Sequence, residues 1–126
     1  VDWCCYLTNK VFCNTDQFTK ATRITAINFT GVGLTGPLLL TLSNLTAMVF
    51  LQLRGNKLKG EIPDSFKSLT KLTFLDLGFN YFRGTLTASL GFMTELVQLK
   101  IDDNFFFGHV PFEALAKLSK LTVFEM

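Results

Sequence analysis

The sequence has few of the residues that most often carry catalysis or bind metals. It contains one histidine, three cysteines, one tryptophan and three prolines among 126 residues, and its formal net charge is only +2. Twelve basic residues are dispersed among ten acidic ones, so nothing indicates a surface for nucleic acid or membrane. No apolar run is long enough to span a bilayer. The length bounds the chain to one domain.

Residues that could perform chemistry are isolated from one another. His109 lies between Gly108 and Val110 at a variable position, where an exposed loop residue is expected. Asp102 and Asp103 form the only adjacent acidic pair, and nothing in the pattern supplies a pocket or a third group for acid–base catalysis. We therefore expect no enzyme activity, no metal site and no cofactor.

What the sequence does contain is an internal repeat of 24 residues. Glycines recur at this period, asparagines recur four residues before them, and apolar residues hold the remaining fixed positions. The glycines are Gly36, Gly60, Gly84 and Gly108, the asparagines are Asn56, Asn80 and Asn104, and the clearest apolar series are Leu51, Leu75 and Leu99 and Leu53, Leu77 and Ile101. The final unit is one residue longer, with the insertion after Pro111 and the strand centred on Phe124.

The segment from Leu51 to Pro63 reads LxLxxNxLxGxIP and resembles the plant-specific leucine-rich repeat. This family includes receptor-kinase ectodomains and polygalacturonase inhibitors. The resemblance covers residues 24–126, and the preceding residues resemble the N-terminal cap of the family. Some repeats depart from the pattern, because Val32 replaces the asparagine and Leu39 and Thr87 replace the proline.

The resemblance implies an α/β solenoid, a right-handed leucine-rich repeat superhelix with a parallel β-sheet on its concave face and 3₁₀ or loop segments on its convex face. We expect a cysteine-containing cap at residues 1–23 and four to five repeats of 24–25 residues at 24–126, without a cap at the C-terminal end. Five strands are expected, around Ile27, Leu51, Leu75, Leu99 and Phe124. Stability must come from neighbouring coils, because one coil alone cannot bury its apolar residues. The inward-turned Asn56, Asn80 and Asn104 are expected to satisfy backbone groups of the adjacent coil.

The cysteines lie together near the N-terminus, in Asp2-Trp3-Cys4-Cys5 and at Cys13. By resemblance to the family cap, Cys5 pairs with Cys13, and Cys4 pairs with a cysteine outside the chain. An intermolecular disulfide and a free thiol remain open for Cys4. Disulfides indicate an oxidising compartment, so we expect an extracellular, secreted or cell-surface protein. Asn28 and Asn44 each begin an N-x-[ST] triplet and are candidate N-glycosylation sites.

The outward positions of the strands form columns that run along the stack, and these columns are the candidate partner-binding surface. Phe50 and Phe74 are its most informative members, because the repeat requires nothing apolar there and aromatic residues beside Arg54 are typical of binding hot spots. Packing beneath the cap or a glycan would explain the two rings equally well. The full predicted surface consists of Phe50, Gln52, Arg54, Phe74, Asp76, Phe79, Gln98, Lys100 and Asp102.

Six further phenylalanines follow the strands and are expected to form a stacked spine on the convex side, with exposure of some of them, notably Phe79, to a partner as the alternative. They are Phe79, Phe82, Phe105, Phe106, Phe107 and Phe112.

The sequence therefore predicts an extracellular, non-catalytic module that recognises a protein, peptide or glycan through its concave face. The alternative is a structural cell-surface or matrix protein that binds further copies of itself end to end into a fibre, because an uncapped terminal coil exposes apolar surface and strand edges. No nucleic-acid partner and no membrane segment are expected.

Overall fold

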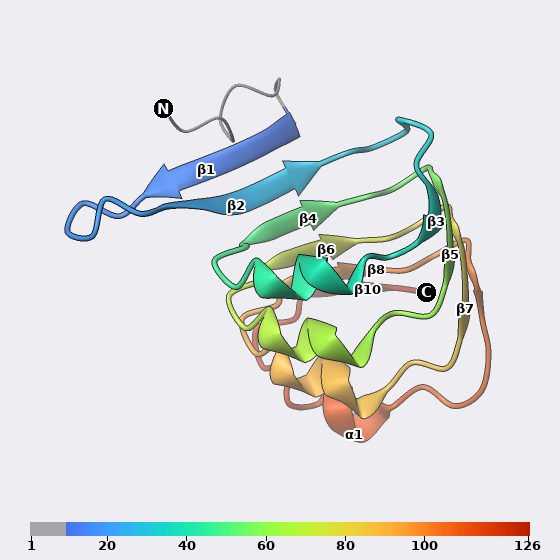
Figure 1. Ribbon diagram of the computed structural model, residues 1–126. Helices are drawn as coiled ribbons and strands as arrows, with labels where there is room; N and C mark the ends of the chain where they lie inside the picture. Colours follow the sequence, from blue (N-terminus) through green and yellow to red (C-terminus); the bar gives the residue numbers. More distant parts are fainter. Residues whose placement is uncertain (1–9) are drawn as a thin grey trace.

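Alternating leucines make the short strands of this chain, because the side chains at i and i+2 of a strand share one face. The computed structural model describes residues 10–126, and in it Leu51, Leu75 and Leu99 are fully buried at equivalent places of successive strands. Each coil consists of two short strands followed by a return segment, and the coils stack into a solenoid (Figure 1).

The larger sheet has six strands in the order β1-β2-β4-β6-β8-β10. The pairs from β2 to β10 are parallel, and their register matches residues one repeat apart, such as Phe50 with Phe74 and Gln52 with Asp76. The longer last repeat keeps this register, because Phe124 pairs with Leu99. The strands are β1 (Val11–Thr15), β2 (Thr22–Asn28), β4 (Phe50–Gln52), β6 (Phe74–Asp76), β8 (Gln98–Lys100) and β10 (Val123–Glu125).

The expected cap region contributes the antiparallel hairpin of β1 and β2. β1 pairs along the outer side of β2 and is the edge strand of the large sheet, so the first parallel strand has hydrogen-bonding partners on both sides. β2 begins at Thr22, so the same strand ends the hairpin and starts the solenoid. Cys4 and Cys5 lie outside the described residues, and the pairing of Cys5 with Cys13 stays a prediction.

A second sheet, which the sequence analysis does not predict, lines the next side of the coils. Its four parallel strands run in the order β3-β5-β7-β9 and alternate exposed and buried residues, as in Lys57, Leu58 and Lys59. Gly36, Gly60 and Gly84 lie in it with φ near +90°, a conformation that glycine adopts without steric cost. The strands are β3 (Thr35–Pro37), β5 (Lys57–Gly60), β7 (Tyr81–Gly84) and β9 (Phe105–Phe106).

The return segments lie opposite the large sheet (Figure 1). Three are the expected 3₁₀ turns, and the fourth, which carries the inserted residue, is a short α-helix. They are η3 (Leu40–Asn44), η4 (Asp64–Ser68), η5 (Ala88–Phe92) and α1 (Phe112–Leu115).

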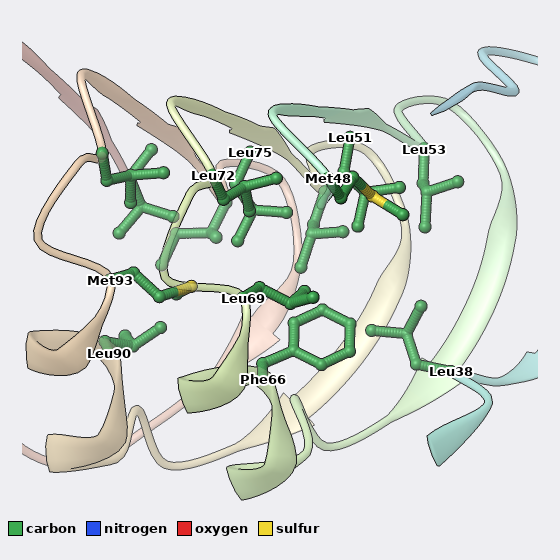
Figure 2. Packing of buried hydrophobic residues seen from close by; sticks show 14 of the residues in the cluster. Leu38, Met48, Leu51, Leu53, Phe66, Leu69, Leu72, Leu75, Leu90 and Met93 are labelled. Atoms are coloured by element: carbon green, nitrogen blue, oxygen red, sulfur yellow. The ribbon is translucent and has the colours of Figure 1, made fainter. Parts of the chain in front are cut away.

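The core is a continuous layer between the large sheet and these turns. Leu51 and Leu75 enter it from the strands, and Phe66, Leu69 and Leu90 enter it from the return segments (Figure 2). The prediction of a stacked phenylalanine spine on the convex side is wrong for most of the six residues. Phe82 is buried and stacks on Phe106, with ring centroids 6.4 Å apart, but both rings belong to the second sheet. Four of the six side chains are exposed to solvent and make no spine, namely those of Phe79, Phe105, Phe107 and Phe112.

The asparagines close the corner between the two sheets. The Asn80 side-chain nitrogen donates to the carbonyl oxygens of Leu53 and Leu77 at 3.0 Å, and its oxygen accepts the backbone N–H of Leu58 at 3.1 Å. Asn56 and Asn104 make equivalent bonds to the coils before them. These are the contacts that the sequence analysis expects, and they satisfy backbone groups that water cannot reach.

We predict that Asn80→Ala lowers the free energy of unfolding by about 3 kcal/mol or more, because it leaves several buried backbone groups unsatisfied at about 1–3 kcal/mol each. Urea unfolding followed by circular dichroism measures the change. Asn44→Ala is the matched control, since Asn44 is exposed, and it should change stability by less than about 0.5 kcal/mol. Equal effects of the two substitutions would contradict the role assigned to Asn80.

Candidate functional site

The outward side chains of the large sheet gather the residues that the sequence analysis predicts as a binding surface, and we call this surface the large-sheet face. The parallel register places Phe50, Phe74 and Gln98 side by side in one row. The adjacent row holds Gln52, Asp76 and Lys100. Arg54, Phe79 and Asp102 lie just beyond the strand ends.

Phe50 and Phe74 form a close aromatic stack. Their ring centroids are 4.4 Å apart and the ring planes differ by 9°. Each residue is half-buried, although each points away from the leucine core. The stack therefore presents a rigid apolar patch on an otherwise polar surface.

Arg54 is held in place by carboxylates from two later coils. Its guanidinium donates to both oxygens of Asp102, at 3.0 and 2.7 Å, and to Asp76 Oδ1 at 3.2 Å. It also lies 4.5 Å from the centre of the Phe79 ring, a cation–π contact. The hydrogen bonds to Asp102 raise the pKa of Arg54, and the same bonds hold the pKa of Asp102 below its ordinary value.

Gly78 makes the reach of Arg54 to Asp102 possible. The column of outward residues reads Arg54, Gly78, Asp102 across three coils, and the middle coil contributes no side chain. A Cβ on Gly78 would lie 2.3 Å from Arg54 Nη1 and 2.7 Å from Asp102 Oδ1. The sequence analysis did not predict this role, although a glycine that lies between residues of opposite charge in one column indicates that their side chains can meet.

Asp76 differs most from expectation. It is only 2% exposed, because Arg54 and Gln52 cover it and its Oδ1 accepts the backbone N–H of Gly78 at 3.0 Å. Buried under these donors, its carboxylate supports Arg54 and does not present itself to solvent. Lys100 is paired as well, with its Nζ 3.2 Å from Glu125 Oε1.

Phe79 has an unusual backbone conformation, with φ of +53°. Gly31 and Gly55 occupy the same repeat position with φ of +62° and +72°, and Asp103 follows one repeat later with φ of +51°. A bulky residue in the left-handed region is sterically disfavoured. The stacking of the coils therefore imposes this backbone conformation, and Phe79 adopts it at a cost in local conformational energy. Its ring is exposed to solvent.

The remaining predicted residues lie apart from this cluster. Asn44 is exposed at the end of η3, and Asn28 is half-buried on the large-sheet face, where its Oδ1 accepts hydrogen bonds from the backbone N–H and the hydroxyl of Thr30. Across residues 10–126 there is no cluster of three metal-binding side chains. Within the same range, none of the helices is long and apolar enough to cross a bilayer.

Comparison with known proteins identifies the repeat. The family model described as Leucine Rich Repeat matches residues 48–69 and 71–93, and no curated protein matches the chain in sequence. The coordinates are similar to those of the leucine-rich repeat ectodomain of the plant membrane receptor kinase GASSHO1/SCHENGEN3 from Arabidopsis thaliana, in complex with CASPARIAN STRIP INTEGRITY FACTOR 2. The TM-score is 0.87 with 32% identity over 98% of this chain and 14% of that one.

Two other solved structures extend the comparison. The plant peptide hormone receptor RGFR1 in complex with RGF2 has a TM-score of 0.73 with 27% identity, over 75% of this chain and 15% of that one. The BIR3–SERK2 complex from Arabidopsis thaliana has a TM-score of 0.85 with 28% identity, over 94% of this chain and 61% of the matched one. The chain thus spans less than two thirds of each of these relatives. The matched part of GASSHO1/SCHENGEN3 is its leucine-rich repeat ectodomain, in agreement with the prediction of a non-catalytic repeat module.

We predict that Gly78→Ala destabilises the fold by about 1–3 kcal/mol, because the added methyl group displaces the Arg54–Asp102 pair. The same substitution in an Arg54→Ala background should cost much less, since the obstructing guanidinium is gone. A double-mutant cycle of urea unfolding energies measures this difference. Additive effects would show that Gly78 serves another purpose.

The lowered pKa of Asp102 predicts a specific pH dependence. An aspartate in the unfolded chain has a pKa of about 3.9, and the folded-state pKa lies below it, so the unfolded state binds more protons between the two values. The stability from this pair is complete above about pH 4 and is lost as pH falls through the folded pKa. Unfolding energies of the wild type and Asp102→Asn, measured from pH 6 to pH 2, should therefore converge at low pH. A constant difference between them would contradict the assignment.

Proposed function

We propose, from the premise that this chain is built of plant-type leucine-rich repeats, that its large-sheet face binds a peptide or protein ligand in the extracellular space. The proposal rests chiefly on the stack of Phe50 on Phe74. Two aromatic rings that point away from the core stay partly in contact with water, and burial by a partner would remove that contact.

The fixed position of Arg54 supports recognition beside the stack. Two carboxylates and the Phe79 ring orient the guanidinium before any ligand arrives, and its side chain remains 27% exposed. Because the Arg54 side chain is already ordered, its binding to a partner costs less conformational entropy. In this proposal Asp76 positions Arg54, and Asp102 lies at the rim of the binding surface.

The charges of the large-sheet face indicate a ligand that is recognised mainly by apolar and amide contacts. Arg54 is paired with Asp76 and Asp102, and Lys100 is paired with Glu125. The half-buried amide of Gln98 lies in the row of the two rings and offers both a donor and an acceptor. An extended peptide that places an apolar side chain on the stack and backbone groups on the neighbouring amides matches this arrangement.

The receptor structures reported above support the same reading. One is a plant peptide hormone receptor in complex with RGF2, and another is an ectodomain in complex with CASPARIAN STRIP INTEGRITY FACTOR 2. The ectodomain character of the first of these structures supports an extracellular or cell-surface location. A glycan at Asn44 and a disulfide between Cys5 and Cys13 are further parts of the proposal, whereas a glycan at Asn28 would cover part of the large-sheet face. A glycan on the exposed Asn44 would lie on the return side and leave the large-sheet face open.

Peptides selected on the folded chain from a displayed random library would test the proposal. We predict that Phe50→Ala/Phe74→Ala weakens binding of the selected peptides at least 30-fold by calorimetry, which corresponds to about 2 kcal/mol for hot-spot residues. Phe92→Ala/Phe112→Ala is the matched control, because both rings are exposed on return segments, and it should leave affinity unchanged. Peptides that bind the stack variant and the wild type equally would refute this surface.

The structural alternative gives a different result in solution. A protein that associates end to end should gain mass with concentration, whereas a recognition module should stay monomeric on dilution. Size-exclusion chromatography with light scattering separates the two. Ordered filaments would favour the structural role over ligand recognition.

A further inference from the structure

The outward side of the second sheet carries a surface distinct from the large-sheet face, and we call it the small-sheet face. It consists of exposed basic and aromatic residues from three successive coils, namely Lys57, Lys59, Tyr81, Arg83, Phe105 and Phe107. The strand register places Lys59 beside Tyr81 and Arg83 beside Phe105, so each of these cations neighbours a ring of the next coil. All six residues are exposed, because they alternate with residues that point into the solenoid.

The cations of this face have no counter-ions of their own. Lys57, Lys59 and Arg83 take part in none of the ion pairs that form within residues 10–126. Two carboxylates lie in this region: Glu61, whose side chain extends over Gly84, and the exposed Asp103, which lines a hollow with Tyr81 and Phe105. Three unpaired cations outnumber them and leave the face positive, whereas Arg54 and Lys100 on the large-sheet face are already paired.

The rings of this face are unusually open to solvent. Tyr81 is 52% exposed, Phe105 is 63% exposed and Phe107 is 64% exposed. Tyr81 and Phe105 lie nearly parallel, with centroids 6.1 Å apart. Beside them is a groove of about 540 Å³, lined by Pro37, Lys59, Gly60, Tyr81, Arg83 and Phe105. Basic and aromatic groups thus line one concavity.

We propose that the small-sheet face is a second docking surface, and that it binds an acidic peptide segment of a partner protein. The unpaired cations select a negatively charged partner, and arginine and tyrosine together with phenylalanine are the residues that protein interfaces favour. A second copy of this chain is a poor candidate, since its own net charge is +2.

The array also sets the order of the ligand residues. Adjacent strands are about 4.8 Å apart, so three coils span about 10 Å, which an extended peptide crosses in three to four residues at roughly 3.3 Å each, with alternate side chains on one face. The matching segment therefore has carboxylates two residues apart, over Lys59 and Arg83, and an aromatic side chain two residues further on, against Phe105, which pairs with Arg83 across neighbouring strands. This surface needs no contribution from Phe50 or Phe74, so it does not depend on the function proposed above.

The test uses a fluorescein-labelled peptide of sequence Gly-Ser-Glu-Gly-Glu-Gly-Trp-Ser-Gly, whose two glutamates and tryptophan share one face when extended, and measures its dissociation constant by fluorescence anisotropy. We expect Lys59→Glu/Arg83→Glu and Tyr81→Ala/Phe105→Ala each to weaken binding at least tenfold. Lys71→Glu/Lys117→Glu has the same change in net charge on exposed, unpaired residues and should change the dissociation constant less than twofold. Phe50→Ala/Phe74→Ala should also leave it unchanged. Circular dichroism melting checks that each variant is folded.

Three outcomes would overturn the proposal. Equal weakening by the Lys71/Lys117 variant would show attraction to net charge alone. Tighter binding of a uronic acid hexasaccharide than of the peptide, without loss in the ring variant, would assign the face to anionic glycans. No binding of the peptide at millimolar protein concentration would leave the face without the partner assigned to it.

Discussion

The structure depends on one buried hydrogen-bonding device, the asparagine at the corner between the two sheets. In the three coils that carry it, at Asn56, Asn80 and Asn104, its side-chain nitrogen reaches a carbonyl 27 residues earlier, and its oxygen accepts an N–H 22 residues earlier. Because both spacings are constant, the distance along the chain from one corner to the next is fixed. The hydrogen bonds thus determine the length of the repeat, which the burial of leucines alone would not determine so closely.

Because the corner between the sheets is fixed, insertions are tolerated only elsewhere in the coil. The inserted residue of the last coil lies after Pro111, on the return side, where the 3₁₀ turn of other coils is replaced by α1. The extra residue is absorbed before the next strand, and Phe124 still pairs with Leu99. The strand columns therefore stay aligned, and the surface that they build remains continuous across coils of unequal length.

Much of this could be predicted from spacing, because burial and backbone satisfaction repeat with the chain. Leu51, Leu75 and Leu99, the asparagines and the outward columns all follow from the period. The second sheet did not follow, since Lys57-Leu58-Lys59 is too short an alternation to separate from a loop. The contact of Arg54 with Asp102 also escaped, because it joins coils two apart and depends on the side chain that Gly78 lacks. The exposure of Phe79 was one of the two expectations for this residue, but its left-handed backbone could not be foreseen, since the coil imposes that conformation.

The two sheet faces differ in whether their charged side chains are paired, and this difference distinguishes their proposed roles. On the large-sheet face, Arg54 and Lys100 are neutralised by carboxylates of neighbouring coils, so its long-range field is weak and its selectivity must come from shape and the aromatic stack. On the small-sheet face, Lys59 and Arg83 have no such partners within residues 10–126, so their field extends into solvent. One solenoid therefore carries a pre-organised apolar site and a positively charged aromatic site on different sides, where two different partners could bind at once without competing for the same residues.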